Sequence, residues 1–529
     1  MKDSQKLKKY KKVFNTYKFS VTLNKRMVLA IKNFCMEKSI SDKDLTKMMI
    51  LTSMVYRTQL RTEKPEVALY HGILRNLFTT KRYAEILDWC VELTIDIVKD
   101  ADHLRGTCKV FKVVDELFDT EGDTFYPGNI DKPLYNNIIE QYREYHEMIK
   151  EFEVFSGDKR ISIQNLYVKE LKKIVRIESV VKYNEGLDTD KKKLKPNSLN
   201  ILTSQLIPLN EGFDNIYSID RNGRIYSILT SLPKKIRGII NFKYNECDLR
   251  QSHPRILSML LCYITNKNET SLGLASYLDI TKDAISRINN IKCPIFKRHK
   301  YYNTLTHKFI NKLHKLSFDY YSYSIHFFDE DFFSNHETVW DSMTIYTNKK
   351  KNEKEKVVVT PKTLDADIQK FLRFFHYPNP DNFYGNISET IKLTDSQVKY
   401  YKGFVDENRL EDCTDVPKQI LKTAFMYFLN GKPKGSEMAK LYSNLFPEID
   451  KIIRYFKSEF NYKIWHSLIT QIEANFVYQV IHECYQQNND NVVGCLHDGL
   501  FYKKEFEKEF KEIFNRVSMQ HFDECFPYK

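Results

Sequence analysis

The spacing of apolar residues along the chain predicts a mostly helical N-terminal region followed by a region of mixed strands and helices. Between about Asn24 and Asp115 apolar residues recur three and four positions apart, which is the period of an amphipathic helix. Residues 81–93 give the clearest such helix, and residues 94–98 and 108–114 predict two strands around a polar turn. This order is typical of a winged helix that contacts nucleic acid, and also of a helical packing domain with a small hairpin.

The pattern changes after a polar stretch rich in lysine at residues 182–200, which predicts a linker. Before it, residues 136–181 predict long charged helices. After it, Ile216–Ser227 alternates β-forming residues around Asn222-Gly223, a strong signal for a two-residue hairpin turn. Helical periodicity then marks residues 381–460, 468–485 and 503–514.

Two β-prone runs that lie far apart in the chain each carry an aspartate at the point where a strand can end. The first leads to Asp248 and the second, which begins at Val492, leads to Asp498. Between them Lys418 and Lys422 recur at helical spacing. Two-metal nucleotidyl transfer requires carboxylates for the metal ions and cations on a helix for the triphosphate. The order of these residues therefore predicts that chemistry.

Each of these residues alone has a simpler interpretation. Asp248 is a plausible strand-end or cap carboxylate, and His497-Asp498-Gly499 a plausible hairpin turn. Lys418 and Lys422 would suit a solvated helix face, and His253 would suit a core histidine bonded to backbone. These simple interpretations are independent of one another, whereas nucleotidyl transfer accounts for all of the residues together.

Composition agrees with a globular nucleic-acid enzyme. The 529 residues allow several domains, and 42% are hydrophobic and 14% aromatic. The net charge of +13 suits a polyanionic partner and equally a soluble basic protein. The ten cysteines include no CxxC pair, which argues against a zinc knuckle and a disulfide framework. No apolar run is long enough for a membrane span, and Met1–Lys12 lacks the apolar core of a signal peptide, so we expect a soluble cytoplasmic protein without a membrane partner.

Several segments, in one order along the chain, resemble the superfamily of family A DNA polymerases and phage-type single-subunit RNA polymerases. Asp248 is similar to the motif A aspartate, and His497-Asp498 to motif C. The fingers-helix pattern Arg-x-x-x-Lys-x-x-x-Phe/Met-x-x-x-Tyr-Gly resembles Lys418-x-x-x-Lys422-x-x-x-Met426-x-x-x-Asn430-Gly431. Three shorter segments are also similar: Asp220–Arg224 to the DxxGR signature of the RNA polymerases, Asp381–Gly385 to the segment before the fingers, and Gln471-x-Glu473 to a template–primer contact.

The resemblance covers about Ile216 to the C-terminus and implies an α+β fold: a right-hand polymerase with a small antiparallel palm sheet, helical fingers and thumb, and a mostly helical N-terminal domain. The implied domains are residues 1–130 (helical, with a winged-helix-like order as one interpretation), 131–200 (helical or thumb-like region and basic linker), 201–266 (palm with motif A), 267–375 (an insertion), 376–465 (fingers) and 466–529 (palm with motif C).

The resemblance also implies a role for each candidate residue. Asp248 and Asp498 would be catalytic and would hold two Mg²⁺ ions, for which Mn²⁺ can substitute. The nucleoside triphosphate would contact Lys418, Lys422, Met426, Asn430 and His253. The nucleic-acid template and primer would contact Arg224, Arg237, Gln471 and His497.

The choice of sugar receives conflicting signals. His253 lies five positions after Asp248, where the DNA polymerases have a bulky residue that blocks a ribose 2′-hydroxyl and the RNA polymerases have glycine. Met426 and the DxxGR segment favour ribonucleotides instead. Because a side chain excludes a hydroxyl directly, we expect DNA synthesis, with a single-subunit DNA-directed RNA polymerase as the alternative. Loss of catalysis on a polymerase-like scaffold, leaving a nucleic-acid-binding protein, is a further alternative, which both aspartates and both lysines disfavour.

Overall fold

The chain divides into two compact units, and each is described by itself. The first comprises Met1–Phe152, Ser162–Tyr217 and Tyr226–Tyr244, and the second comprises Glu153–Ile161, Ser218–Ile225 and Asn245–Lys529. The structure is a computed structural model that describes residues 21–62, 65–69, 80–99, 109–119, 123–125, 153–156, 159–162, 175–187, 193–194, 199, 202, 206, 216–219, 224–227, 230, 232–241, 243–265, 271–290, 299–325, 343–348, 353–357, 359, 361–405, 410, 415–431, 436–487, 492–496 and 499–522.

The first unit contains a helical core beside a three-stranded sheet with the strand order β2-β4-β3. Met48, Ile86 and Phe111, from two helices and the central strand, are fully buried together. The helix–strand–strand order expected near residues 81–114 is confirmed by α5, β3 and β4. The elements are β1 (Val21–Leu23), α2 (Lys25–Glu37), α3 (Asp42–Thr62), β2 (Val67–Leu69), α5 (Thr80–Leu93), β3 (Ile95–Lys99), β4 (Lys109–Val113), η1 (Asp115–Leu117), β5 (Asp123–Phe125), α8 (Ile177–Glu185) and α11 (Lys234–Asn241).

Four strands lie where the two units divide the chain. The hairpin expected at 216–227 is borne out by its strands, β8 (Ile216–Ile219) and β9 (Ile225–Ser227). The expectation of long helices across residues 136–181 is wrong at β6 (Glu153–Ser156) and β7 (Lys159–Ser162), which pair with each other. The sequence there holds Val, Phe and Ile around Gly157-Asp158, a dipeptide typical of a two-residue hairpin turn. The β propensity of this short segment outweighs its charge.

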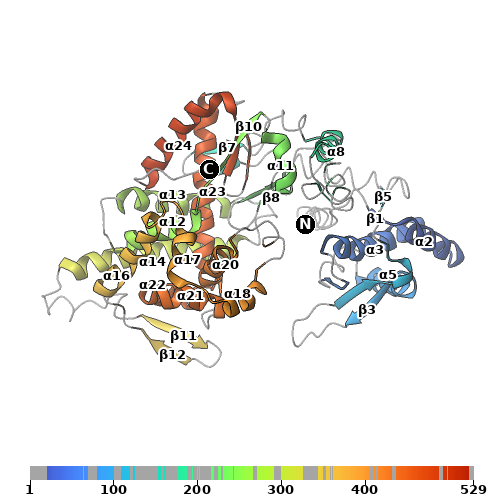
Figure 1. Ribbon diagram of the computed structural model, residues 1–529, viewed down its shortest axis with the longest axis horizontal. Coiled ribbons are helices and arrows are strands. Elements are labelled where there is room, and N and C mark those ends of the chain that lie inside the picture. The colour runs from blue at the N-terminus through green and yellow to red at the C-terminus, as the bar shows by residue number, and fades with distance from the viewer. Residues whose placement is uncertain are drawn as a thin grey trace. The chain divides into compact units, whose positions relative to one another are not determined.

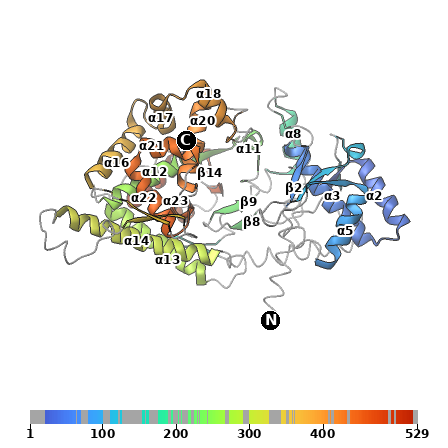
Figure 2. The same ribbon diagram turned by 90° about the horizontal axis from the view of Figure 1, so that it is seen from below.

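The second unit is built around the long helix α23 (Ile464–Gln487), with α12, α13 and α14 packed beside it (Figures 1 and 2). Trp465, Leu468 and Ile472 of α23 are fully buried, as expected for a helix that is apolar around most of its circumference. The unit's other helices are α12 (Ser252–Ile264), α13 (Ser271–Asn290), α14 (His299–Ile325), α16 (Pro361–His376), α17 (Phe383–Ile391), α18 (Asp395–Lys402), α20 (Val416–Asn430), α21 (Glu437–Leu445), α22 (Pro447–Glu459), η6 (Lys504–Phe506) and α24 (Glu507–Phe522).

A small sheet with the strand order β10-β14-β13 completes the second unit. Its strands are β10 (Tyr244–Asp248), β13 (Val492–Cys495) and β14 (Gly499–Lys503), and β13 and β14 are antiparallel. A separate antiparallel hairpin, β11 (Thr344–Asn348) and β12 (Glu353–Lys356), lies in the unassigned segment 267–375 together with α13, α14 and most of α16. The chain is therefore mostly helical with small antiparallel sheets, in agreement with an α+β class.

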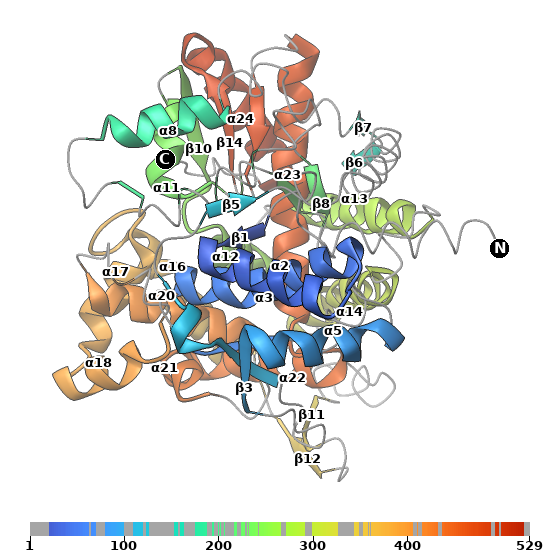
Figure 3. The same ribbon diagram turned by 90° about the vertical axis from the view of Figure 1, so that its right-hand side faces the viewer.

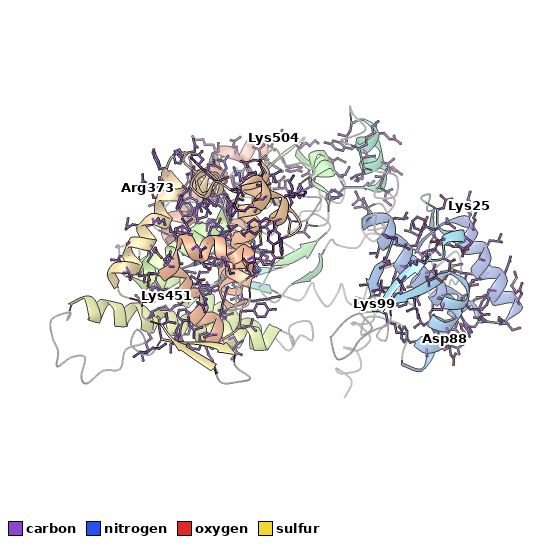
Figure 4. All side chains as sticks on the ribbon, turned by 60° about the horizontal axis from the view of Figure 1, so that its bottom comes forward. Lys25, Asp88, Lys99, Arg373, Lys451 and Lys504 are labelled. Atoms are coloured by element: carbon purple, nitrogen blue, oxygen red, sulfur yellow. The ribbon has the colours of Figure 1, made fainter. Side chains whose placement is uncertain are left out.

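Both units carry charged side chains on their surfaces. Figure 4 marks exposed Lys25, Asp88 and Lys99 on the first unit and exposed Arg373 and Lys504 on the second. Across the ranges that the structure describes, no helix combines the length and the apolar character that crossing a membrane requires.

Candidate functional site

The strand that leads to Asp248 and the strand that follows Asp498 are neighbours in the β10-β14-β13 sheet. β10 ends at Asp248 and β14 begins at Gly499, and Figure 3 shows the two strands side by side. A Cβ atom on Gly499 would lie 2.0 Å from the carbonyl oxygen of Cys247 and 3.1 Å from Cα of Asp248. The main chain of the residue that follows Asp498 is thus packed directly against the main chain at Asp248.

The other side of Asp498 is fixed by the hairpin. The N–H of Leu496 donates to the carbonyl oxygen of Gly499 over 2.7 Å. His497 and Asp498 join these two residues and lie outside the described residues. Of the two residues joined by this hydrogen bond, Gly499 is the one that approaches the main chain at Asp248.

The end of β10 places the Asp248 carboxylate next to the thiol of Cys247. Asp248 is half-buried. Burial raises the pKa of the adjacent Cys247 thiol well above its usual value, and the Asp248 carboxylate adds to the shift. The thiol therefore stays protonated, and the carboxylates of β10 are Glu246 and Asp248. Among the described residues, to which Asp498 does not belong, no three His, Cys, Asp or Glu side chains lie together as a metal site.

The turn after Asp248 leads into α12 and fastens it to a loop between α16 and α17. The Gln251 side chain donates to the carbonyl oxygen of Asp381. The Arg255 guanidinium donates to the Asp381 carboxylate over 2.5 Å, and it also lies 4.9 Å above the ring of Phe375. Arg255 is buried, whereas the Asp381 side chain is 42% exposed, so solvent screens part of this charge-assisted bond.

The 377–382 loop is held from its other side by Asn386, which is fully buried in α17. Its amide donates to the carbonyl oxygens of Phe374 and Asn379, each over 2.8 Å, and accepts the N–H of Asn379 over 3.1 Å. A Cβ atom on Gly385 would lie 2.2 Å from Nδ2 of Asn382, so the glycine leaves the space that the Asn382 amide occupies. These contacts place the Asn382 side chain.

Asn382 in turn contacts the helix that carries the predicted cations. The Lys418 ammonium donates to Oδ1 of Asn382 over 2.6 Å. α20 begins after Asp415, whose carboxylate accepts the N–H of Lys418 over 3.0 Å as an N-cap, with Pro417 in the first turn. Lys418 is thereby located at the first turn of α20, where the helix dipole also favours an anionic ligand.

The four predicted nucleotide contacts on α20 lie on its less buried side. Lys418, Met426 and Asn430 are half-buried and Lys422 is exposed. The opposite side of the helix carries the core residues Ile420, Leu421, Ala424, Phe425 and Phe428. A spacing of four residues keeps neighbouring members of the set on one side of a helix, so α20 presents them away from the core.

The carboxyl end of α20 is also fixed. The buried ammonium of Lys457, on α22, donates to the carbonyl oxygen of Phe428. Burial lowers the pKa of Lys457 to about 7, while Asp450 opposes that shift. This contact ties the end of α20 near Asn430 to α22.

His253 lies on the first turn of α12 and stacks on His466 of α23. The two rings are 5.5 Å apart between centroids, with 12° between their planes. His253 is half-buried. The position that the sequence analysis assigned to sugar selection is therefore held against the central helix of the second unit.

The predicted template contacts are distributed over both units. Arg224 pairs with Glu473, which is fully buried on α23, and Gln471 on the same helix is also buried. Arg237 belongs to α11 in the first unit. His497, Asp220 and Gly223 lie outside the described residues. The structure thus gives Arg224 a buried structural partner, and its contact with a template stays a prediction.

Sequence reasoning missed three side chains that the structure brings to this region: Gln251, Arg255 and His466. The first two lie three and seven positions after Asp248, one helical turn apart, and this spacing could have drawn attention to them. His466 carries no comparable signal, because its ring meets His253 only through the packing of α23 on α12.

Comparison with known proteins adds no assignment. No family model matches the chain, and no curated protein or solved structure matches it either. The interpretation of the site therefore rests on the chain's own residues and their geometry.

Proposed function

We propose that the protein is a template-directed nucleic-acid polymerase that extends a 3′-hydroxyl by a two-metal mechanism. The observation that carries the proposal is the contact of Gly499 with the main chain at Cys247 and Asp248. This contact joins two segments some 250 residues apart in sequence, each of which carries one of the aspartates predicted to bind metal. A strand-end cap and an unrelated hairpin turn give no reason for these two positions to meet.

The donor set suits magnesium. Carboxylate oxygens are ligands that Mg²⁺ prefers, and Asp248 supplies such a group at the end of β10. Asp248 and Asp498 would hold two Mg²⁺ ions, or Mn²⁺ in their place. When bound, such ions supply charge neutralisation at the phosphates and lower the pKa of the 3′-hydroxyl.

The remaining residues have roles that follow from their positions. Lys418 and Lys422, on the less buried side of α20, would bind the triphosphate, and Met426 and Asn430 would lie nearer the base and sugar. His253 would border the sugar. Arg224, Arg237, Gln471 and His497 would contact template or primer, and the exposed basic side chains would contribute electrostatic attraction to the phosphate backbone.

The sugar that the enzyme selects can be tested at His253. If its ring occupies the space of a 2′-hydroxyl, the wild-type enzyme prefers deoxynucleotides, and His253→Gly raises the kcat/KM for ribonucleotides with a smaller change for deoxynucleotides. The measurement is single-nucleotide extension with matched dNTP and rNTP. A wild-type enzyme that prefers rNTPs contradicts the exclusion of the 2′-hydroxyl by His253 and favours the RNA polymerase alternative. Asn430 is then the next residue to test.

The basic residues before β10 provide a test of nucleic-acid binding. If Lys234, Lys235 and Arg237 follow the template path, replacing all three with glutamine flattens the slope of log K against log salt by about two to three units, because fewer counterions are released. Titration of a labelled primer–template at several salt concentrations measures the slope. An unchanged slope would place these side chains on a solvated face.

The proposed activity itself is tested by Mg²⁺-dependent incorporation of labelled nucleotides on a primed template. A catalytically decayed binding protein would retain the primer–template and incorporate nothing.

A further inference from the structure

A chain of contacts connects the segment after Asp248 with the cation on α20. Arg255 and Gln251 hold Asp381, its neighbour Asn382 accepts from Lys418, and Gly385 leaves room for the Asn382 amide. We call Gln251, Arg255, Asp381, Asn382 and Lys418 the Arg255–Lys418 bridge. It spans three separate segments of the chain.

We propose that the Arg255–Lys418 bridge is a positioning device that presents the Lys418 ammonium to the triphosphate of the incoming nucleotide. Arg255, Asp381 and Asn382 are positioning residues in this proposal, because they act through Lys418 and need not touch the nucleotide. The inference rests on the function proposed above and adds the residues that set nucleotide affinity.

The chemistry of lysine supports this role. A lysine ammonium stands on a flexible four-carbon stem, and restraining that stem on binding costs entropy. Its three N–H groups allow one bond to Oδ1 of Asn382 while two still point to phosphate oxygens. The amide therefore restrains the stem in advance without consuming the charge, and it adds no charge that would repel a triphosphate.

The loop is suited to transmit position because it is fixed from both sides. Asn386 holds its main chain from α17, and Arg255 and Gln251 hold Asp381 from α12. Asp381 itself has a left-handed backbone, with φ of 56°, a conformation that aspartate tolerates better than most non-glycine residues.

The bridge also relates Lys418 to the carboxylate end of β10. Gln251 and Arg255 follow Asp248 by three and seven residues in the turn and helix that β10 leads into. A shift of α20 relative to this turn would strain the contacts at Asp381 or Asn382. A displacement of about 1 Å between catalytic groups can lower the rate roughly a hundredfold. Contacts that hold α20 against the turn after β10 would therefore preserve the rate of phosphoryl transfer.

The rival interpretation is that the bridge only stabilises the fold. The two differ in a measurable way. A positioning residue acts through Lys418, so its removal raises the KM for nucleotide and has no further effect once Lys418 is absent. A merely stabilising residue lowers the melting temperature and has the same effect on activity whether or not Lys418 is present.

The test is a double-mutant cycle on the full-length protein with a primed template. Asn382→Ala is expected to raise the KM for the matched nucleotide about three- to tenfold, the effect of losing one hydrogen bond of typical net strength, with kcat changed less than about twofold. Asn379→Ala is the matched control, because its side chain lies in the same loop, is exposed, and donates to Glu389 instead. It should leave KM unchanged.

Arg255→Lys is expected to raise KM in the wild-type background, as Asn382→Ala does. In the Lys418→Ala background, each of the two substitutions is expected to change KM by less than about twofold. Equal effects with and without Lys418 would overturn the inference. If Asn382→Ala fails to fold, Gly385→Ala takes its place, because the added methyl group moves the Asn382 amide without removing it. The same double-mutant cycle is then measured with Gly385→Ala.

The outcome separates this inference from the proposed function. If the wild-type protein extends primers but the effects of Asn382→Ala and Lys418→Ala on KM are additive, only the positioning role is overturned. A wild-type protein that extends no primer, and binds no fluorescent nucleoside triphosphate in the presence of Ca²⁺, overturns the function and the positioning role together.

Discussion

Replacing Asp248 with alanine is expected to lower nucleotide incorporation by at least about a hundredfold while primer–template binding changes little. The carboxylate would hold the metal ions at the end of β10, so its removal deletes electrostatic stabilisation of the transition state and leaves the binding surface in place. A hundredfold loss corresponds to about 2.7 kcal/mol in the barrier. Primer extension under single-turnover conditions and a filter-binding titration measure the two quantities.

Asp498→Ala is expected to have the same effect, because the second carboxylate serves the same ions. Asp395→Ala supplies the control, since that aspartate is exposed on the first turn of α18. Either site variant extending primers at more than about a tenth of the wild-type rate would contradict the assignment.

Gly499→Ala is expected to abolish incorporation through a change that adds only one methyl group. The new Cβ would meet the Cys247 carbonyl oxygen at 2.0 Å, so β14 has to move away from β10 and Asp498 moves with it. Overpacking of this kind costs about 1–3 kcal/mol, and we expect a lower melting temperature as well. Thermal unfolding followed by circular dichroism, together with primer extension, measures both effects.

Gly403→Ala is the matched control for this substitution. Its Cβ would lie 3.5 Å from the nearest atom, the carbonyl oxygen of Tyr400, and its backbone is right-handed helical. A Gly499→Ala protein with wild-type activity and stability would show that the contact between β10 and β14 is not required.

Local sequence patterns predicted the elements that carry the candidate site. Helical periodicity identified α5, α20 and α23, and the two β-prone runs became β10 and the β13–β14 hairpin. Local reasoning failed at β6 and β7, because a charge-rich context concealed a short hairpin signal at Gly157-Asp158. It also left residues 267–375 unassigned, where a mixture of aromatic and lysine residues supports no single period.

Partners across the fold could not be predicted in the same way. The spacing of Lys418 and Lys422 places both on one side of a helix, but nothing in it indicates that Asn382 accepts from Lys418. Arg255 and Asp381 are separated by 126 residues and meet only because α12 packs near the 377–382 loop. Local spacing reports which residues share a face, while long-range packing decides what that face touches.

The most direct test of the account is template-directed incorporation by the purified full-length protein. Four primed templates that differ in the first unpaired base are each offered one labelled nucleotide at a time, with Mg²⁺ or with EDTA. We predict that the wild-type protein adds the complementary nucleotide in each case, that EDTA abolishes the addition, and that Mg²⁺ or Mn²⁺ restores it. Addition regardless of the template base, or no addition with either metal on any template, would contradict the proposal of a template-directed polymerase.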